Sequence, residues 1–365
     1  MHARVAVLGA TGSIGRQAVE VAGAHRDRLR VVGLSCRTSA DACDALARED
    51  GARVVVAERD GEDAVVDLAR ADDVDLVVVG IPGIAALRPT LAALDAGKAV
   101  AIAAKEVLVV AGQLVRARVS GAGERLRPID SEHCALWQCL RGEDPSTVES
   151  VTLTASGGPF RELPLDEFAD ATAQRALQHP TWHMGPKVTI DSATLVNKAF
   201  EIIEAHWLFD LAYDNVGAVI HPQSLVHAMV RFADGSVKAQ LADPDMRLPI
   251  QYALLYPVRM RSAVRRLELH ELQFAPIEPA RYPCYVLVLD AARRGPAATI
   301  AVNAADEVAV ERFLRGEIAF TAIADVLERA LSIAARSRLG PAPDLPTILA
   351  FDREVRRELM AKAIA

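Results

Sequence analysis

The chain has 365 residues, of which 51% are hydrophobic, and its formal net charge is −7. This length allows two or three domains with sizeable cores, and no apolar run approaches the roughly 20 residues that span a bilayer. The acidic balance argues against broad binding to nucleic acid or to anionic membranes, so an anionic ligand would need a local pocket.

The N-terminal part of the chain begins with an apolar run, Val5–Leu8, almost directly after Met1. Because no charged segment and cleavage site precede this run, we expect a cytoplasmic protein without a secretory signal. Up to about residue 120, short β-branched runs alternate with helical patterns such as Ala40–Glu49 and Ile84–Ala96. This alternation predicts a doubly wound parallel sheet, an α/β fold. The expected strands are Arg4–Leu8, Arg30–Ser35, Arg53–Ala57, Asp75–Gly80 and Ala99–Ala103.

The pattern changes after Gly121–Gly123. The runs Val226–Phe232 and Ser236–Leu241 flank Asp234-Gly235, which predicts a hairpin in a mixed sheet. Pro257–Pro283 is irregular, and the remainder is helical in pattern, with breaks at Gly295-Pro296 and Gly340–Pro346. We therefore expect a Rossmann-like NADPH-binding domain (1–124), a central catalytic α/β domain with a mixed sheet (125–256), a linker (257–284) and a C-terminal helical bundle (285–365).

The cysteines are odd in number and form neither a CxxC pair nor a zinc spacing. This scatter predicts reduced thiols. They are Cys36, Cys43, Cys134, Cys139 and Cys284.

The first strand is followed by Gly9-Ala10-Thr11-Gly12-Ser13-Ile14-Gly15, which opens a helix. Glycines at this spacing permit a tight turn and a close approach of the backbone to a pyrophosphate, and the free N–H groups of a helix N-terminus favour an anion. The alternative is a bare tight turn. Because strand, turn, helix and second strand follow in the expected order, cofactor binding is favoured.

The end of the second strand selects the cofactor. An NAD site places a carboxylate there, whereas an NADP site favours arginine and small donors. Here no acidic residue occurs between the end of the second strand and Asp41. Arg37 can bind a 2′-phosphate there with help from Ser35 or Thr38. Arg37 could equally be a solvated loop residue, but the missing acid favours NADPH.

Two segments could supply a metal site, although two acids in a loop are usually solvated. Asp130 and Glu132 follow a short apparent strand, and in extended geometry both carboxylates would share one face. Oxygen ligands suit Mg²⁺ or Mn²⁺. Further along, Ser192 or Thr194 could cap a helix continuing to about Phe209.

On that helix Asn197 and Lys198 would share a face with Glu201. Such a stripe could be a surface ion pair, or it could hold a phosphate and a third metal carboxylate, and the motif leaves these readings even.

Two further segments are compatible with a phosphosugar pocket, and a third lies where a ligand would bind. Ser156-Gly157-Gly158-Pro159 offers backbone N–H groups for an anion. His179–Lys187 is rich in proline, glycine and aromatic residues, as a closing lid would be, although an ordinary surface loop fits as well. Lys105-Glu106 comes just after the fifth strand, at the sheet edge where doubly wound folds bind ligands.

Taken together, these motifs resemble those of the 1-deoxy-D-xylulose 5-phosphate reductoisomerase family over nearly the whole chain. They include Gly-Ala-Thr-Gly-Ser-Ile-Gly, Ala-Lys-Glu, Asp-Ser-Glu-His, Ser-Gly-Gly-Pro-Phe, His-Pro-x-Trp-x-Met-Gly, Asp-Ser-Ala-Thr-x-x-Asn-Lys and His-Pro-Gln-Ser, in that order, with Asn303–Glu307 in the helical region. The resemblance implies a homodimeric enzyme of non-mevalonate isoprenoid biosynthesis that requires NADPH and Mg²⁺ or Mn²⁺. It implies conversion of 1-deoxy-D-xylulose 5-phosphate to 2-C-methyl-D-erythritol 4-phosphate by retro-aldol cleavage, re-addition and hydride transfer.

The resemblance also assigns residues. The implied metal ligands are Asp130, Glu132 and Glu201, which are the implied catalytic residues together with Lys105. The implied substrate contacts are Ser131, Ser156, His179, Trp182, Met184, Ser192, Asn197 and Lys198, with Trp182 and Met184 in a flap. The expected cofactor contacts are Gly9, Thr11, Gly12, Ser13, Ile14, Ser35, Arg37, Thr38, Lys105, Glu106 and Gly185.

The sequence departs from the family pattern at a few positions. Ala104 stands where the family commonly has Asn, and Cys36-Arg37-Thr38 replaces the usual 2′-phosphate loop. Cys134 and Trp137 also differ from the usual residues. Two other functions remain to be tested: a semialdehyde or hydroxy-acid dehydrogenase, and a dinucleotide-sensing protein without catalysis.

Overall fold

The computed structural model describes residues 2–119, 124–180, 182, 184–269 and 271–361. Contacts within the chain define two compact units. The first unit contains residues 1–107, 114–142 and 245–268, and the second contains residues 108–113, 143–244 and 269–365. The domain boundaries expected at residues 124, 256 and 284 stay predictions.

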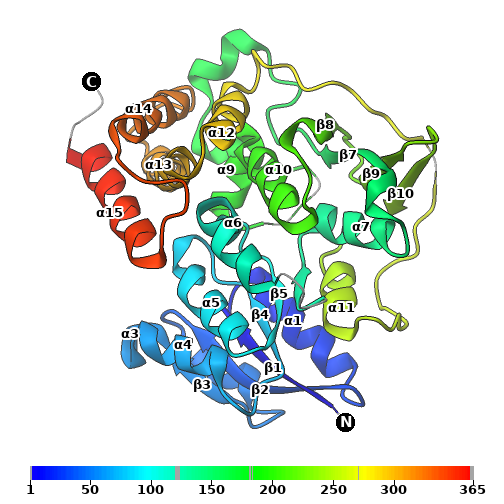
Figure 1. The fold of residues 1–365 in the computed structure, drawn as a ribbon. Coiled ribbons are helices and arrows are strands. Elements are labelled where there is room, and N and C mark those ends of the chain that lie inside the picture. Colours follow the sequence, from blue (N-terminus) through cyan, green and yellow to red (C-terminus); the bar gives the residue numbers. More distant parts are fainter. Residues whose placement is uncertain (1, 120–123, 181, 183, 270, 362–365) are drawn as a thin grey trace. The chain divides into compact units, whose positions relative to one another are not determined.

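The first unit is built on a parallel sheet with the strand order β3-β2-β1-β4-β5-β6 (Figure 1). This order, with the first strand of the chain in the interior, is that of dinucleotide-binding doubly wound folds. All four residues of β4 are buried, as expected for a strand covered on both faces, so the predicted fold class is confirmed here. The strands are β1 (Ala3–Leu8), β2 (Leu29–Cys36), β3 (Arg53–Val56), β4 (Leu76–Val79), β5 (Ala99–Ile102) and β6 (Leu126–Pro128).

Helices cover this sheet, and the late helix α11 (Arg247–Leu255) joins them. Figure 1 shows α11 beside α1, and the two helices are in contact although they lie far apart in the sequence. Arg127 donates a hydrogen bond to the carbonyl oxygen of Ala253 at 2.8 Å, and Trp137 meets the Tyr252 ring edge-on. The other helices are α1 (Ser13–Ala24), α2 (Ala40–Ala47), α3 (Ala57–Asp60), α4 (Glu62–Arg70), η1 (Ile84–Ala86), α5 (Leu87–Asp95) and α7 (Ser131–Leu140), while α6 (Glu106–Val119) contributes residues to both units.

The second unit contains a mixed sheet with the order β10-β9-β7-β8, in which β7 and β8 are parallel and the other pairs antiparallel. The hairpin predicted around Asp234-Gly235 is confirmed as β9–β10. Next to the sheet, His221 donates from Nδ1 to the carbonyl oxygen of Gln273, so the irregular stretch before α12 is tied to the sheet. The strands are β7 (Val148–Ala155), β8 (Val216–Ile220), β9 (Val226–Phe232) and β10 (Val237–Leu241).

The C-terminal part of this unit is helical, as predicted. The helix α13 contacts α12, α14 and α15, and also α9. Gly295 separates α12 from α13 with a positive φ of 100°, a conformation that glycine adopts without a steric cost. The helices are η2 (Pro145–Thr147), η3 (Leu165–Asp170), α8 (Ala173–Ala176), α9 (Pro186–Thr194), α10 (Val196–Phe209), η4 (Tyr213–Asn215), α12 (Pro283–Arg294), α13 (Pro296–Leu314), α14 (Ala322–Arg336) and α15 (Leu345–Ala361).

The extended geometry expected around Asp130 is wrong. Strand β6 ends at Pro128, Asp130 is the N-cap residue of α7, and Glu132 lies in the first turn of that helix. Acidic residues are favoured at these two places because the helix N-terminus carries partial positive charge. The two side chains are therefore brought together by a helix start and not by one face of a strand.

The single helix expected from Ser192 to Phe209 is also wrong. The chain forms α9 and α10 instead, with Leu195 between them in the left-handed conformation at φ 55°. Ser192 thus belongs to the last turn of α9. Leu195 is 2% exposed, and burial of its side chain offsets the left-handed backbone, which costs roughly 1–2 kcal/mol.

All five cysteines are buried free thiols, in agreement with the sequence. Burial raises the pKa of the Cys134 thiol to about 12, so this thiol stays protonated at neutral pH. Within the described part of the chain, none of the helices has the length and apolar character needed to cross a membrane.

Candidate active site

The glycine turn between β1 and α1 has the geometry of a phosphate cradle. Gly9 has φ 81°, and a Cβ atom on it would lie 2.7 Å from the carbonyl oxygen of Gly80. A Cβ atom on Gly15 would lie 2.2 Å from the carbonyl oxygen of Gly9, so only glycine allows this turn. The exposed Gly12 is the N-cap residue of α1, and it has no side chain that could bond the first N–H groups of the helix. Those groups suit an anion.

Ser35 and Arg37 at the end of β2 have different environments. Ser35 is 1% exposed, and both its carbonyl oxygen and its hydroxyl oxygen accept hydrogen bonds from the N–H group of Gly9. It therefore supports the turn from behind. Arg37 is 86% exposed and forms an ion pair with Glu58 at 3.3 Å, beside the exposed Thr38. Because the Arg37 side chain is exposed, its guanidinium group can reorient toward a phosphate.

A polar group lies where β5 and β6 end. Lys105 Nζ is 2.6 Å from Asp130 Oδ2, and both side chains are largely buried. Ser131 donates a hydrogen bond to Glu132 Oε2 at 2.6 Å. Glu106, 6% exposed, begins α6 directly after Lys105. Parallel neighbours β5 and β6 thus deliver Lys105, Asp130 and Glu132 to the carboxyl edge of the sheet.

In the second unit, one face of α10 carries a buried polar cluster. Asn197 donates from Nδ2 to Glu201 Oε1 at 2.5 Å, and Lys198 forms an ion pair with Glu201 Oε2. Lys198 and Glu201 are 3% and 2% exposed. The i,i+3 and i,i+4 spacing seen in the sequence therefore does bring these groups together, and in the interior instead of on the surface. Buried charges are costly unless they are paired and hydrogen-bonded, and here Lys198 and Glu201 pair with each other.

Helix α9 places Ser192 and anchors the end of the predicted lid. Ser192 is 7% exposed in its last turn. At the start of α9, Lys187 Nζ lies 2.6 Å from Asp191 Oδ2 and 2.6 Å from Asp306 Oδ2 of α13. Asp306 is completely buried, so this bridge fixes the beginning of α9 against the C-terminal helices.

The loop after β7 is joined to the predicted lid by hydrogen bonds. Ser156 Oγ lies 2.9 Å from His179 Nε2, and it also accepts the N–H group of Gly158 at 3.2 Å. The N–H group of Trp182 donates to His179 Nδ1 at 2.8 Å. The Trp182 ring lies 6.4 Å from the ring of His227 on β9.

These bonds determine how His179 is protonated. Burial, with a contribution from the charge of Arg161, lowers the pKa of His179 to about 4, so the ring is neutral at pH 7. Because Nδ1 accepts the Trp182 N–H group, the ring proton is on Nε2 and is donated to Ser156 Oγ. Ser156 Oγ then accepts two hydrogen bonds, and its own proton is available to an oxygen atom of a ligand.

The structure thus forms three groups from the predicted site residues: the glycine turn with the end of β2, the carboxyl edge of β5 and β6, and the cluster around α9, α10 and the loop after β7. Met184 is half-buried, and Gly185 is the exposed N-cap of α9. Thr181 and His183 of the predicted lid lie outside the described residues.

Sequence reasoning missed two residues that hold this last group. Arg161 directly follows the Ser-Gly-Gly-Pro-Phe motif, and a cation beside an anion loop was the signal that could have found it. Tyr282 bonds Gly157 from far along the chain, and no local pattern marks it.

Comparison with protein families covers most of the chain. The family model described as 1-deoxy-D-xylulose 5-phosphate reductoisomerase matches residues 5–62 and 58–112. Two models of reductoisomerase C-terminal domains match residues 126–209 and 241–358. Among curated relatives, the 1-deoxy-D-xylulose 5-phosphate reductoisomerase of Thermomicrobium roseum is 45% identical, covering 100% of this chain and 99% of the relative. That of Moorella thermoacetica is 46% identical with the same coverage.

Solved structures agree with these matches. A crystal structure of DOX-P reductoisomerase in complex with NADPH, fosmidomycin and magnesium is 36% identical, with a TM-score of 0.92 over 98% of both chains. The Zymomonas mobilis enzyme in complex with NADPH is 35% identical, with a TM-score of 0.88 over 99% of both chains. The chain therefore belongs to the 1-deoxy-D-xylulose 5-phosphate reductoisomerase family.

Proposed function

We propose that this chain converts 1-deoxy-D-xylulose 5-phosphate to 2-C-methyl-D-erythritol 4-phosphate with NADPH and Mg²⁺ or Mn²⁺, in non-mevalonate isoprenoid biosynthesis. The observation that carries the proposal is the buried cluster of Asn197, Lys198 and Glu201 on α10. In a metal-dependent enzyme acting on a phosphosugar, the ammonium group would bind the phosphate and the carboxylate would bind the cation. Membership of the family supports the same reaction, because the curated relatives are named 1-deoxy-D-xylulose 5-phosphate reductoisomerase.

The residues of the first unit fit NADPH. The glycine turn leaves room for a pyrophosphate only because Gly9 and Gly15 lack a Cβ atom, and α1 offers free N–H groups. Arg37 would hold the 2′-phosphate after leaving Glu58, with Thr38 beside it. Thr11, Gly12, Ser13 and Ile14 would line the pyrophosphate; Ser35, Lys105, Glu106 and Gly185 complete the proposed cofactor set.

The donor set fits a hard divalent cation. Asp130, Glu132 and Glu201 supply only carboxylate oxygens, which suit Mg²⁺ or Mn²⁺ and not a zinc-type site. When bound, the cation would polarise oxygen atoms of the substrate as a Lewis acid, and NADPH would supply the hydride. Lys105 forms an ion pair with Asp130, so its ammonium group orients that carboxylate.

The proposed substrate residues divide by chemistry. Ser156, Ser192, Asn197 and Lys198 supply hydroxyl, amide and ammonium donors, which suit a phosphate. His179, held neutral, would orient Ser156 and contact the substrate, and Ser131 would contact it from the start of α7. Trp182 and Met184 would cover the bound substrate and exclude water. Exclusion of water strengthens the electrostatic interactions and keeps the cleaved fragments together until they recombine.

The protein's location and assembly belong to the same proposal. We infer a cytoplasmic homodimer that binds a small-molecule phosphosugar and neither nucleic acid nor membrane. Support for a dimer comes from the mixed sheet. In strand β10, Val237 is 51% exposed and Ala239 is exposed on the same face, where a second copy could cover them. Sedimentation analysis should give twice the chain mass, and a concentration-independent monomer would contradict this inference.

The test is an NADPH oxidation assay with 1-deoxy-D-xylulose 5-phosphate, with and without a chelator. We expect oxidation that needs both the phosphosugar and Mg²⁺ or Mn²⁺, and a product with the mass of methylerythritol phosphate. No turnover with either metal would refute the proposal. Oxidation with a semialdehyde or hydroxy acid in the presence of chelator would indicate a dehydrogenase, and tight NADPH binding without any turnover would indicate a sensing protein.

A further inference from the structure

The loop Ser156–Gly158 is held by its backbone carbonyl groups. Arg161 donates from Nη1 to the carbonyl oxygen of Ser156 at 2.8 Å. The hydroxyl group of Tyr282 donates to the carbonyl oxygen of Gly157 at 3.0 Å. Tyr282 is 2% exposed, so this hydrogen bond is made in the interior, where a lost partner is costly.

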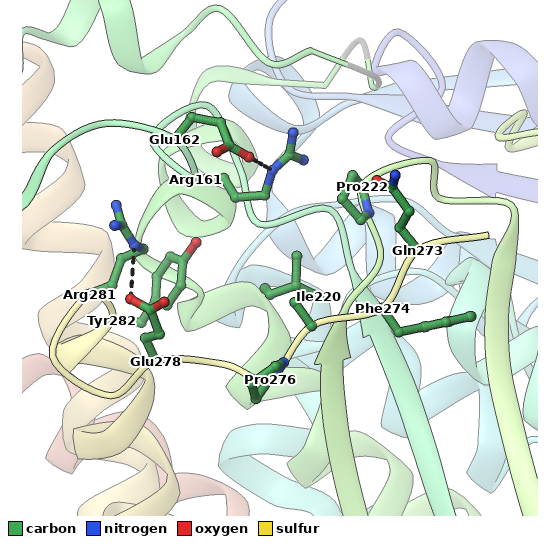
Figure 2. Close-up of a pocket in the computed structure, with 11 residues that line it drawn as sticks. Arg161, Glu162, Ile220, Pro222, Gln273, Phe274, Pro276, Glu278, Arg281 and Tyr282 are labelled. Atoms are coloured by element: carbon green, nitrogen blue, oxygen red, sulfur yellow. Dashed lines mark hydrogen bonds and ion pairs between the residues drawn. The ribbon is translucent and has the colours of Figure 1, made fainter. Parts of the chain in front are cut away.

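These two side chains line a pocket of about 400 Å³ in the second unit. Figure 2 shows Arg161 and Glu162 on one side of it and Tyr282 beside Arg281 and Glu278 on another. Arg281 donates from Nη1 to the carbonyl oxygens of Leu163 and Phe160, at 2.6 Å and 3.3 Å. The segment after the loop is therefore fixed from the same side.

The loop needs such support because its own glycine-rich backbone is intrinsically flexible. Gly157 and Gly158 have φ values of 84° and 68°, and consecutive glycines are the most flexible residues in an unfolded or loosened chain. Gly158 also packs so closely on α9 that an added Cβ atom would lie 2.5 Å from the carbonyl oxygen of Ser192. Ser156 and Ser192 consequently keep a fixed spacing only while the loop stays in place.

We propose that Arg161 and Tyr282 are positioning residues that hold the Ser156–Gly158 loop in the shape that binds the substrate phosphate. This inference rests on the proposed function, in which Ser156 and Ser192 contact that phosphate. Arg161 and Tyr282 bond the carbonyl side of the loop, whereas Ser156 Oγ is bonded by His179 and Gly158 and keeps its proton for the substrate. They act through the loop and not on the reacting atoms.

The experiment compares Tyr282→Phe and Arg161→Met with the wild type. Each removes one hydrogen bond to a loop carbonyl group, and we expect the KM for the phosphosugar to rise about five- to tenfold. The kcat should change little, and the KM for NADPH should stay unchanged. Arg161→Lys, which keeps a donor and a positive charge, should restore part of the affinity.

Two variants in the same unit serve as controls. One removes a tyrosine hydroxyl group and the other removes an arginine side chain. Tyr213→Phe alters a half-buried tyrosine that stacks on His206, and Arg293→Met removes an exposed arginine paired with Asp214. Neither should change the KM for the phosphosugar. Equal KM increases for phosphosugar and NADPH in the loop variants would mean general destabilisation and would overturn the proposal.

A second measurement does not depend on turnover. Hydrogen exchange of the amides of Gly157, Gly158 and Phe160 should become about tenfold faster in both loop variants, because each hydrogen bond that is lost stabilises the closed loop by about that factor. Unchanged exchange would overturn the positioning role even if the wild type is active. An inactive wild type with faster exchange in the variants would instead refute the proposed function and leave the loop support established.

Discussion

The two glycines of the phosphate loop should respond differently to alanine, although both have positive φ values. An alanine at either position adopts a left-handed conformation that costs roughly 1–2 kcal/mol. At Gly158 the new Cβ atom would lie 2.5 Å, 2.8 Å and 2.9 Å from backbone atoms of Ser192 and Ala193, which cannot move without shifting α9. Such overpacking adds about 1–3 kcal/mol.

At Gly157 the new Cβ atom would lie 2.7 Å, 2.9 Å and 3.1 Å from Cδ, Cγ and Cβ of Arg161. The Arg161 side chain would have to shift and would strain its hydrogen bond to the Ser156 carbonyl oxygen, but no backbone atom of α9 would have to move. We therefore expect Gly158→Ala to lower the melting temperature by about 2–12 °C more than Gly157→Ala, given about 2–4 °C per kcal/mol for a unit of this size. Calorimetry of the full chain measures this. Gly158→Ala should also weaken phosphosugar binding more, because it changes the spacing between Ser156 and Ser192. An equal or larger temperature loss for Gly157→Ala would refute the steric reasoning.

Three further predictions address the site. Glu201→Gln should lower kcat by about a thousandfold or more, because a metal carboxylate is lost, yet leave NADPH affinity measured by fluorescence unchanged. Arg37→Ala should raise the KM for NADPH by about ten- to a hundredfold and leave the KM for NADH unchanged. Glu58→Gln should lower the KM for NADPH, because Arg37 then has no ion pair with a carboxylate to break before it binds the 2′-phosphate. Acidification should weaken the lid. Burial lowers the pKa of His179 from 6.5 in the unfolded chain to about 4 in the folded protein. The stability that the neutral ring confers is therefore complete above about pH 6.5 and is lost as the pH falls toward 4.

Each of these predictions has a control. Glu311→Gln removes an exposed carboxylate on α13 and should leave kcat unchanged, so a similar loss there would contradict a special role for Glu201. Equal effects of Arg37→Ala on both nucleotides would rule out the 2′-phosphate contact. For the lid, His179→Gln should remove the pH dependence of stability between pH 4 and 6.5, and a dependence that persists would assign it to another group.

The fold of the first unit could be predicted because its signals are local. The buried strands are continuous apolar runs, as β4 shows, and the turn at Gly9 depends on contacts within one strand–turn–helix and its neighbour. The hairpin at Asp234-Gly235 likewise follows from turn chemistry over a few residues. The polar face of α10 was read correctly from its spacing, but spacing could not tell a surface ion pair from a buried one.

Two local structures could not be read from the sequence. The segment from Ser192 onward contains no glycine or proline, so periodicity joins α9 and α10 into one helix. At the break Leu195 has a left-handed backbone and a buried side chain that packs in a cluster with Ala155, Ile220 and Tyr282, and these contacts belong to the packed unit. At Asp130 the acidic pair was compatible with both a strand and a helix start, and the N-cap decides in favour of the helix.

The support of the substrate loop differs in kind from that of the cofactor turn. The turn at Gly9 is held by atoms of β1, β2 and β4, the strands next to it in the sheet. The loop at Ser156 relies on Tyr282, from the segment leading into the C-terminal helices. It also packs through Gly158 on α9, which the bridge from Lys187 ties to Asp306 of α13. Because those bonds are made only when the C-terminal helices are packed, any change that loosens them should impair phosphosugar binding before NADPH binding. The helical region is therefore part of the substrate site through its hydrogen bonds, even where none of its residues contacts the substrate.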